Sequence, residues 1–451
     1  MSLIRKIKDY YKKEKRLLFT TPSHSLGDFI ISDLQKLLGK DYFKSDFSEI
    51  GGFDNLRDPN GVIANLQEYL SRVYSSKKTF MLVNGSSSGI IASMLSLLKK
   101  DDKVLVARNC HVSVYNGLVL TGATPIWFLP QYNYDWGIYK GVCVTDIKKL
   151  INDNKDIRAL IITSPTYEGI YSDITKISDI CQKNDICLIV DEAHGALNNF
   201  YSSKHNTAVL EGADISIQSL HKTCGAPNPC ALLHISKKSS IPPEKLQKSL
   251  NLINTTSPSY PILAAIEATV SFLISNTGKK HLACLLSDLQ SFKDNLPEEI
   301  EWFELNDETK LLLRIKGKNN LIIAELLNQK YNIEEEYSTK DFMLFLTGIG
   351  TTKAKLKMLN KALHKIVKNE NIEDLSYANI EKYCLPSMVY TPQEAYHKNV
   401  SVIDTSMAEN KICAELVTTY PPGIPVLFPG ERINLSNIFK IDKAKIKIFN
   451  D

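Results

Sequence analysis

A lysine and an aspartate that each follow an apolar run are the pair in this chain most suited to chemistry. Asp191 opens Asp-Glu-Ala-His-Gly after the run 186–190, and Lys222 ends Ser-Leu-His-Lys after the run 213–218. A lysine amine can condense with an aldehyde, and a carboxylate can keep a pyridine nitrogen protonated so that the ring accepts electrons. The pair indicates a pyridoxal 5'-phosphate (PLP) site. With 54 Lys and Arg in the chain, Lys222 taken alone would be an ordinary loop lysine.

Two further loops supply groups that such a site needs. The loop 84–89, Asn-Gly-Ser-Ser-Ser-Gly, lies between an expected strand and an expected helix. Its hydroxyls and the free amides of the helix start would bind a phosphate, although many loops of this kind are plain turns and caps. His111 follows the expected strand 103–107 and would stack on a pyridine ring. A solvated or hydrogen-bonded loop histidine is the alternative for His111.

Short apolar runs alternate with helix-length segments between residues 79 and 235. The expected strands are Thr79–Val83, Lys103–Ala107, Pro125–Leu129, Ala159–Thr163, Ile186–Val190, Ile215–Gln218 and Ala231–Ile235. Continuous apolar strands separated by helices are typical of a mostly parallel sheet covered on both faces. The predicted fold class is therefore α/β with a seven-stranded sheet. In such sheets ligands bind beyond the carboxyl ends of the strands, where all the candidate cofactor residues fall.

The pattern changes after the helical run 260–275. Strands are expected at 310–316 and 342–347, and helices at 321–329 and 353–368, which indicates a small α+β domain. The polar stretch 368–374 would form a boundary. We divide the chain into an N-terminal segment with the large domain (1–275), a small α+β domain (276–370) and a C-terminal domain (371–451).

The amino-acid composition of the chain excludes several classes of protein. The 451 residues are 43% hydrophobic and 23% charged, as in a globular protein, and the net charge of +4 implies no nucleic-acid partner. Nine scattered cysteines without a Cys-x-x-Cys pair indicate reduced thiols in a cytoplasmic protein and no metal site. No apolar stretch reaches the roughly 18 residues of a membrane span. The basic segment 1–16 would form an amphipathic helix that packs on the domain or on a neighbouring subunit, with membrane contact as the alternative.

The order of these motifs resembles that of the bacterial ornithine/lysine/arginine decarboxylases, a family of fold-type I PLP enzymes. The likeness is to the short form without an N-terminal wing domain, and it runs from about Thr21 to Glu431. The matching stretches are 21–24, 48–56, 84–89, 108–111, 164–169, 191–195, 219–223, 255–261, 420–425 and 429–431. The resemblance implies an aspartate aminotransferase-like large domain and a homodimer or larger homo-oligomer. It also implies that the proline-rich stretch 420–431 lines the mouth of the site.

The resemblance assigns cofactor roles to residues of these stretches. The phosphate would be held by Ser86, Ser87, Ser88, Ser219 and His221. The ring would be contacted by His111, Asp191, Ala193 and His194, and the aldehyde would attach to Lys222. The catalytic residues would be Lys222, Asp191, His111 and His194. A satisfied core histidine is an equal alternative for His194, and a local cap or turn is the alternative for Ser219 and His221.

The resemblance also implies a substrate and residues that bind it. The reaction would be decarboxylation of arginine, lysine or ornithine in polyamine metabolism, with arginine favoured because short family members are associated with it. Thr166 and Tyr167 would approach the cofactor's phenolic oxygen or the substrate. Glu431, and Asp54 from a partner subunit, would pair with the cationic end of the substrate. Simple solvation is the alternative for both acids.

Some positions depart from the family pattern and leave substrate choice open. They are Ser23, Ser25, Val112, Cys224 and Ala265. A second hypothesis is another fold-type I activity such as an aminotransferase, which would need Arg314 or Arg432 to hold the α-carboxylate of the substrate. A third is a protein that binds PLP without turnover.

Overall fold

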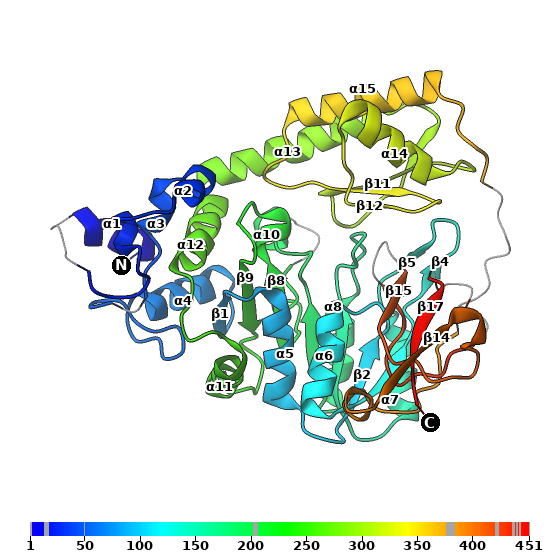
Figure 1. The fold of residues 1–451 in the computed structure, drawn as a ribbon, viewed down its shortest axis with the longest axis horizontal. Coiled ribbons are helices and arrows are strands. Elements are labelled where there is room, and N and C mark those ends of the chain that lie inside the picture. The colour runs from blue at the N-terminus through cyan, green and yellow to red at the C-terminus, as the bar shows by residue number, and fades with distance from the viewer. Residues whose placement is uncertain are drawn as a thin grey trace.

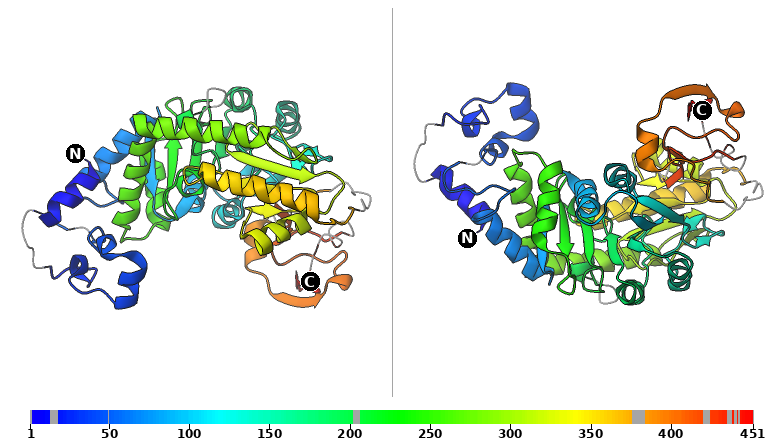
Figure 2. Two further views of the ribbon diagram at one scale, coloured as in Figure 1. Left: turned by 90° about the horizontal axis from the view of Figure 1, so that it is seen from above. Right: turned by 90° about the horizontal axis from the view of Figure 1, so that it is seen from below.

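The computed structural model describes residues 2–12, 18–48, 50–201, 206–375, 384–419, 424–434, 438, 441 and 443–450. Figure 1 shows a central sheet flanked by helices, with a smaller sheet and its helices above it. The N-terminal helices and the C-terminal strands lie at opposite ends of the molecule (Figure 2). Within the described residues, no helix is both long and apolar enough to cross a membrane.

The central sheet has the seven strands that the sequence predicts. Their order is β1 (Lys78–Leu82), β9 (Ala231–Ile235), β8 (Ile215–Ser219), β7 (Cys187–Asp191), β6 (Ile157–Thr163), β2 (Lys103–Ala107) and β3 (Thr124–Phe128). Strand β9 is antiparallel to β1 and β8, and the strands from β8 to β3 are parallel. The mostly parallel α/β fold is confirmed.

Both faces of this sheet are covered, which explains why its strands are apolar throughout. Successive residues of β2 point to opposite faces, so Val104 and Val106 lie in one core while Leu105 and Ala107 lie in another. The first core is closed by α5 (Gly85–Leu97), α6 (Val112–Thr121) and α11 (Pro243–Ile253). The second is closed by α7 (Val144–Asp153) and α8 (Ile174–Lys183).

The smaller sheet is antiparallel. Its order is β10 (Ile300–Trp302), β11 (Lys310–Ile315), β13 (Met343–Leu346) and β12 (Tyr337–Ser338). Helices α13 (Asn276–Asp294), α14 (Asn320–Tyr331) and α15 (Lys353–Asn369) complete its core. The two expected strands and two expected helices are confirmed. Helix α13 and the short strands β10 and β12 carried too little apolar patterning to be predicted.

The two ends of the chain pack against the large sheet and its helices. Helix α1 (Leu3–Lys12) buries Leu3 and Ile7 against α12 (Tyr260–Ile274), and the Ile4 amide donates to the Glu267 carboxylate at 2.8 Å. The amphipathic N-terminal helix therefore packs on its own domain.

The C-terminal part forms two strand pairs, β14 (Val400–Asp404) with β17 (Lys445–Phe449) and β15 (Val417–Thr419) with β16 (Ile424–Leu427). Residues 420–423, expected at the mouth of the site, lie outside the described residues.

Candidate active site

Asp191 and Lys222 lie at neighbouring strand ends, as the sequence predicts. Asp191 is the last residue of β7, and Lys222 lies in the short helix α10 (Leu220–Thr223) that directly follows β8. The two strands are adjacent and parallel, with Asp191 opposite Ile217. In Figure 1 this edge of the sheet faces the smaller sheet. The two candidate catalytic groups therefore meet at one end of the sheet.

The surroundings of the lysine favour a reactive amine. Burial lowers the pKa of Lys222, while the charges of Asp191 and Glu336 oppose that shift. Asp191 is only 4% exposed, and its Oδ1 accepts from the Ala193 amide at 3.1 Å. No hydrogen bond to Asp191 Oδ2 occurs within the described part of the chain, so that oxygen is available to a protonated ring nitrogen.

The serine loop becomes the first turn of α5. This helix starts at Gly85, whose φ of +74° lets the chain turn sharply out of β1. The first amides of a helix have no carbonyl partner within it and attract anions. The Ser88 hydroxyl donates to the Gly85 carbonyl at 2.8 Å, while Ser86 and Ser87 are half-buried. The loop thus presents amides and hydroxyls of the kind that hold a phosphate.

Ser219 provides the structural test of whether the site fits PLP. Its hydroxyl is fully buried at the end of β8 and has no hydrogen-bond partner among the described residues. An unpaired buried hydroxyl costs free energy, so a ligand oxygen at this position would stabilise it. His221 is directed elsewhere, because its Nδ1 donates to the Cys230 carbonyl at 2.9 Å. The donor set fits a phosphorylated cofactor held at Lys222.

His111 caps α6 and lies close to the catalytic pair. Its Nδ1 accepts from the Ser113 amide at 3.2 Å, which fixes the ring at the helix start. Burial lowers the pKa of His111, the Asp191 carboxylate raises it, and the Lys222 ammonium lowers it. Contact between this ring and a cofactor ring stays a prediction.

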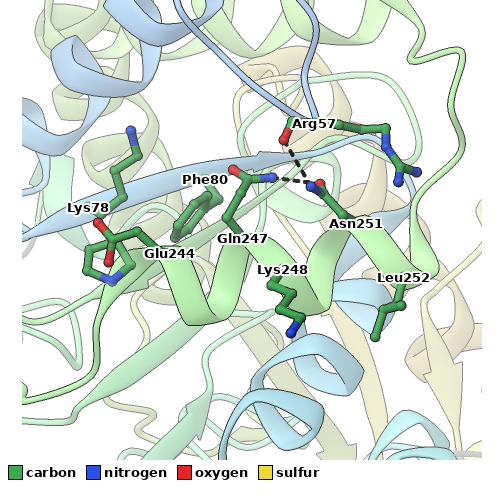
Figure 3. A pocket seen from close by; sticks show the side chains of 9 residues that line it. Arg57, Lys78, Phe80, Glu244, Gln247, Lys248, Asn251 and Leu252 are labelled. Atoms are coloured by element: carbon green, nitrogen blue, oxygen red, sulfur yellow. Dashed lines mark hydrogen bonds between the residues drawn. The ribbon is translucent and has the colours of Figure 1, made fainter.

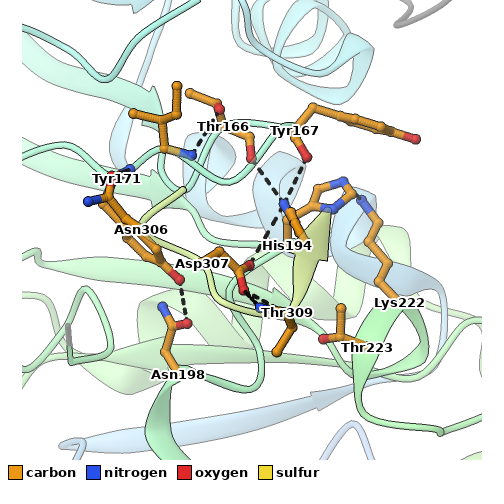
Figure 4. A network of polar contacts seen from close by, with 12 residues as sticks. Thr166, Tyr167, Tyr171, His194, Asn198, Lys222, Thr223, Asn306, Asp307 and Thr309 are labelled. Carbon is orange, nitrogen blue, oxygen red and sulfur yellow. Dashed lines mark hydrogen bonds and ion pairs between the residues drawn. The ribbon is translucent and has the colours of Figure 1, made fainter. Parts of the chain in front are cut away.

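His194 contacts the candidate Schiff-base lysine directly. Its Nε2 lies 2.8 Å from Lys222 Nζ, and its ring packs on Tyr167 with centroids 4.5 Å apart (Figure 4). Burial and the positive charges of Lys310 and Lys222 hold the pKa of His194 well below its ordinary value. The imidazole is therefore neutral and accepts from the lysine. Its Nδ1 is buried and has no partner in the described ranges, unlike a satisfied core histidine.

The turn after β6 brings Tyr167 to the same place. The Tyr167 hydroxyl donates to Glu336, which directly precedes β12. Thr166 is fully buried and its Oγ1 accepts from the Ile170 amide at 3.2 Å, so its side chain closes the turn. Of the two residues, Tyr167 is the one whose side chain contacts His194, the partner of Lys222.

Neither acid expected to bind the substrate cation has a free carboxylate. Asp54 accepts from the amides of residues 60, 61, 63 and 64 at 2.6 to 3.2 Å, and so caps α4 (Val62–Val73). Glu431 forms a buried bidentate pair with Arg108 at 2.5 and 2.7 Å. Each carboxylate already accepts hydrogen bonds within the chain, and a role for either acid in substrate binding stays a prediction.

Two charged groups near the site were missed by the sequence analysis. Lys310 lies in β11 of the smaller sheet and Glu336 directly precedes β12; the charge of Glu336 raises the pKa of Lys222, and that of Lys310 lowers the pKa of His194. Glu336 is exposed, whereas Lys310 is 1% exposed. Nothing in the local sequence distinguishes them from the many other acids and lysines of the chain.

The arginines that an aminotransferase would need are engaged elsewhere. Arg314 donates to Glu301 and Asp135, both at 2.8 Å, and its guanidinium lies 3.9 Å from the centre of the Trp136 ring. Arg432 donates to the Asn410 carbonyl at 2.8 Å.

A depression in the surface, away from the candidate site, contains none of the predicted site residues. It lies along α11, where Gln247 donates to Asn251 and Asn251 donates to the Arg57 carbonyl, both at 2.9 Å (Figure 3).

Known structures share this fold. A lysine decarboxylase from Francisella novicida is 21% identical and superposes with a TM-score of 0.86 over 99% of this chain and 81% of its own. A ureidoglycine–glyoxylate aminotransferase from Bacillus subtilis, 14% identical, superposes with a TM-score of 0.54 over 71% of this chain and 89% of its own. The fold is that of fold-type I PLP enzymes.

Sequence relatives indicate which family of PLP-dependent enzymes the chain resembles. An arginine decarboxylase from Bacillus subtilis is 28% identical over 442 residues, covering 94% of this chain and 90% of its own. The inducible lysine decarboxylase of Escherichia coli is 23% identical over 94% of this chain and 74% of its own. The Orn/Lys/Arg decarboxylase major domain matches residues 2–314, and the C-terminal domain of that family matches residues 373–442. The chain belongs to the Orn/Lys/Arg decarboxylase family of PLP-dependent enzymes.

Proposed function

We propose that the protein decarboxylates arginine, with lysine and ornithine as the competing substrates, to give an amine used in polyamine formation. Three relatives of which this chain covers 90–91% are named arginine decarboxylases, whereas it covers 74% of the inducible lysine decarboxylase. A cytoplasmic homo-oligomer, at least a dimer, is part of the proposal. In the net reaction the bond between Cα and the carboxylate carbon breaks, carbon dioxide leaves, and a proton takes its place.

Bound PLP would supply the electron sink for that bond cleavage. Lys222 would hold its aldehyde carbon, Asp191 would keep a proton on its ring nitrogen, and the start of α5 with Ser219 would hold its phosphate. The neutral His194 accepts a hydrogen bond from Lys222 Nζ at 2.8 Å. In the proposed reaction Lys222 would deliver a proton to Cα, and His194 would hold the lysine amine through this hydrogen bond.

The observation that carries the choice of a basic substrate is the carboxylate of Glu336. It is exposed, it is held by the Tyr167 hydroxyl, and its charge acts on Lys222. A basic substrate bound beside Lys222 would extend its cationic side chain toward this acid. Pairing of a guanidinium or ammonium with a carboxylate is a strong, charge-assisted interaction.

The test combines product identification with two matched variants. The holoenzyme is incubated separately with arginine, lysine and ornithine, and the carbon dioxide and amine released are measured. Glu336→Gln should lower kcat/KM for the best substrate about 10- to 100-fold, as expected for loss of a charged hydrogen bond worth ~1.5–3 kcal/mol. Glu334→Gln, an exposed acid two positions earlier, should leave it unchanged. Keto-acid formation in place of carbon dioxide would refute the proposal.

A further inference from the structure

A fully buried lysine joins the small domain to the active-site turn. Lys310 opens β11, and its Nζ donates to the carbonyls of Thr166 at 3.2 Å and Tyr167 at 2.8 Å. The Asp307 carboxylate lies 3.9 Å from the same nitrogen. Burying a lysine is costly unless it is paired and hydrogen-bonded, so this position is held by specific contacts. The proposed reaction does not use Lys310 directly.

The turn and the segment 307–310 fit closely together. Gly169 has a φ of +109°, and a Cβ placed on it would lie 2.9 Å from Lys310 Cδ and 3.0 Å from Asp307 Cβ. The Asp307 amide donates to the Gly169 carbonyl at 3.1 Å, and its carboxylate accepts from the Tyr201 hydroxyl at 2.9 Å. Figure 4 shows Thr166, Tyr167 and Asp307 converging on this point. The turn therefore has little freedom to move.

The position of the turn determines what His194 contacts. The Tyr167 ring packs on the His194 ring with centroids 4.5 Å apart, and His194 Nε2 lies 2.8 Å from Lys222 Nζ. A chain of contacts thus runs from Lys310 through Tyr167 and His194 to the catalytic amine. Small displacements in such a chain can lower a rate substantially, because the reacting groups must meet in a narrow geometry.

The charge of Lys310, like its position, favours a neutral His194 that accepts from Lys222. The positive charges that lower the pKa of His194 are those of Lys310 from β11, Lys222 and His221 from α10, and His111 from the start of α6, while the Tyr167 ring packs against it. After burial, the Lys310 ammonium has the largest effect in lowering the pKa of His194. Burial also lowers the pKa of Lys310 itself, to about 8, although Asp307, Glu168 and Glu336 favour its charged form.

We propose that Lys310 is a positioning residue for the decarboxylation: it fixes the Thr166–Tyr167 turn against His194, and its charge keeps His194 a neutral acceptor for Lys222. The rate measurements that test this inference rest on the proposed function, because they follow the proposed decarboxylation. The inference also concerns the state of Lys222 and His194 in the protein whatever the substrate.

The test uses the holoenzyme and four variants. Lys310→Met removes the charge and the donors, Lys310→Arg keeps both, and Lys310→Gln, which keeps one donor, replaces the methionine variant if that does not fold. Lys316→Met is the matched control, because Lys316 follows the same strand and its side chain is 58% exposed. The measurements are kcat and KM against pH, the absorbance of the cofactor bound at Lys222 against pH, and the urea unfolding midpoint.

The expected result separates positioning from stability. Lys310→Met should lower kcat about 10- to 100-fold, with little change in KM. The acidic limb of its rate profile should move to higher pH, because His194 loses the neighbouring charge and protonates more readily. The absorbance titration should move in the same direction, and Lys310→Arg should restore most of both. A Met or Gln variant with a lower unfolding midpoint but unchanged kcat and pH profiles would overturn the proposal.

The absorbance titration keeps this test distinct from the proposed function. If wild-type protein decarboxylates no basic amino acid, the proposed function fails. The inference about Lys310 then stands if its variants still shift the absorbance titration, and falls if they do not.

Discussion

Replacing Glu431 with glutamine should destabilise the protein far more than it changes substrate binding. Glu431 and Arg108 are 1% and 0% exposed, and their guanidinium–carboxylate contacts are 2.5 and 2.7 Å. The Phe428 amide also donates to Glu431 Oε2, at 2.8 Å. The substitution leaves the Arg108 charge buried without its counter-ion.

The size of the effect follows from these contacts. Removing one partner of a buried ion pair costs about 3–5 kcal/mol. Arg108 would keep its bond to the Val426 carbonyl at 2.9 Å, and its guanidinium lies 4.5 Å from the centre of the Phe428 ring. Because these contacts compensate in part, we expect Glu431→Gln to lower the free energy of unfolding by ~3 kcal/mol, near the lower end of that range.

Urea unfolding followed by tryptophan fluorescence is a suitable assay, because Trp127 stacks on Phe428 at 4.6 Å and so reports on this junction. Glu415→Gln is the control: Glu415 pairs with Lys443 at 2.8 Å with a partly exposed carboxylate, so its loss should cost less than ~1 kcal/mol. The double variant Arg108→Met with Glu431→Met should lose less stability than the two single losses added together. The reasoning is wrong if Glu431→Gln unfolds like wild type while KM for basic amino acids rises.

Two further predictions concern other buried acids. Asp54→Asn should lower the unfolding free energy by about 1–2 kcal/mol, because the α4 cap loses a charged acceptor, and should leave KM unchanged; an altered KM in steady-state kinetics would return Asp54 to the substrate site. Burial raises the pKa of Glu192 from 4.5 to about 8, so its carboxyl is protonated in the folded protein at neutral pH. The folded state then binds the proton more tightly than the unfolded state, and the stability from this group is lost as pH rises from about 5 through 8. Urea midpoints at pH 6 and 9 should therefore differ more for wild type than for Glu192→Gln, and equal differences would contradict the assignment.

Much of the site could be predicted because it depends on local order along the chain. Asp191 ends a strand of the mostly parallel sheet, and Lys222, His111 and the serine loop each follow another of its strands. The carboxyl ends of parallel strands lie on one edge, so recognising the strands was enough to bring these residues together. The strands could be recognised as continuous apolar runs because both faces of the sheet are buried.

The hydrogen-bond partners of the two acids could not be predicted, for the opposite reason. The partner of Glu431 is Arg108, 323 positions away, and the amides that bind Asp54 become available only when α4 forms. A sequence shows that a carboxylate exists but not which donors reach it. Glu336 and Lys310 were missed in the same way, because their charges act on the site only after the small domain has docked.

The sequence by itself determined the sheet, the order of the motifs along it and the identity of the lysine and aspartate at its edge, since these follow from short-range patterns of polarity. The tertiary structure alone decided which charged side chains are paired with other groups of the protein and which are left unpaired. Pairing energies depend on distance and burial, and both are set by contacts between segments that are remote along the chain.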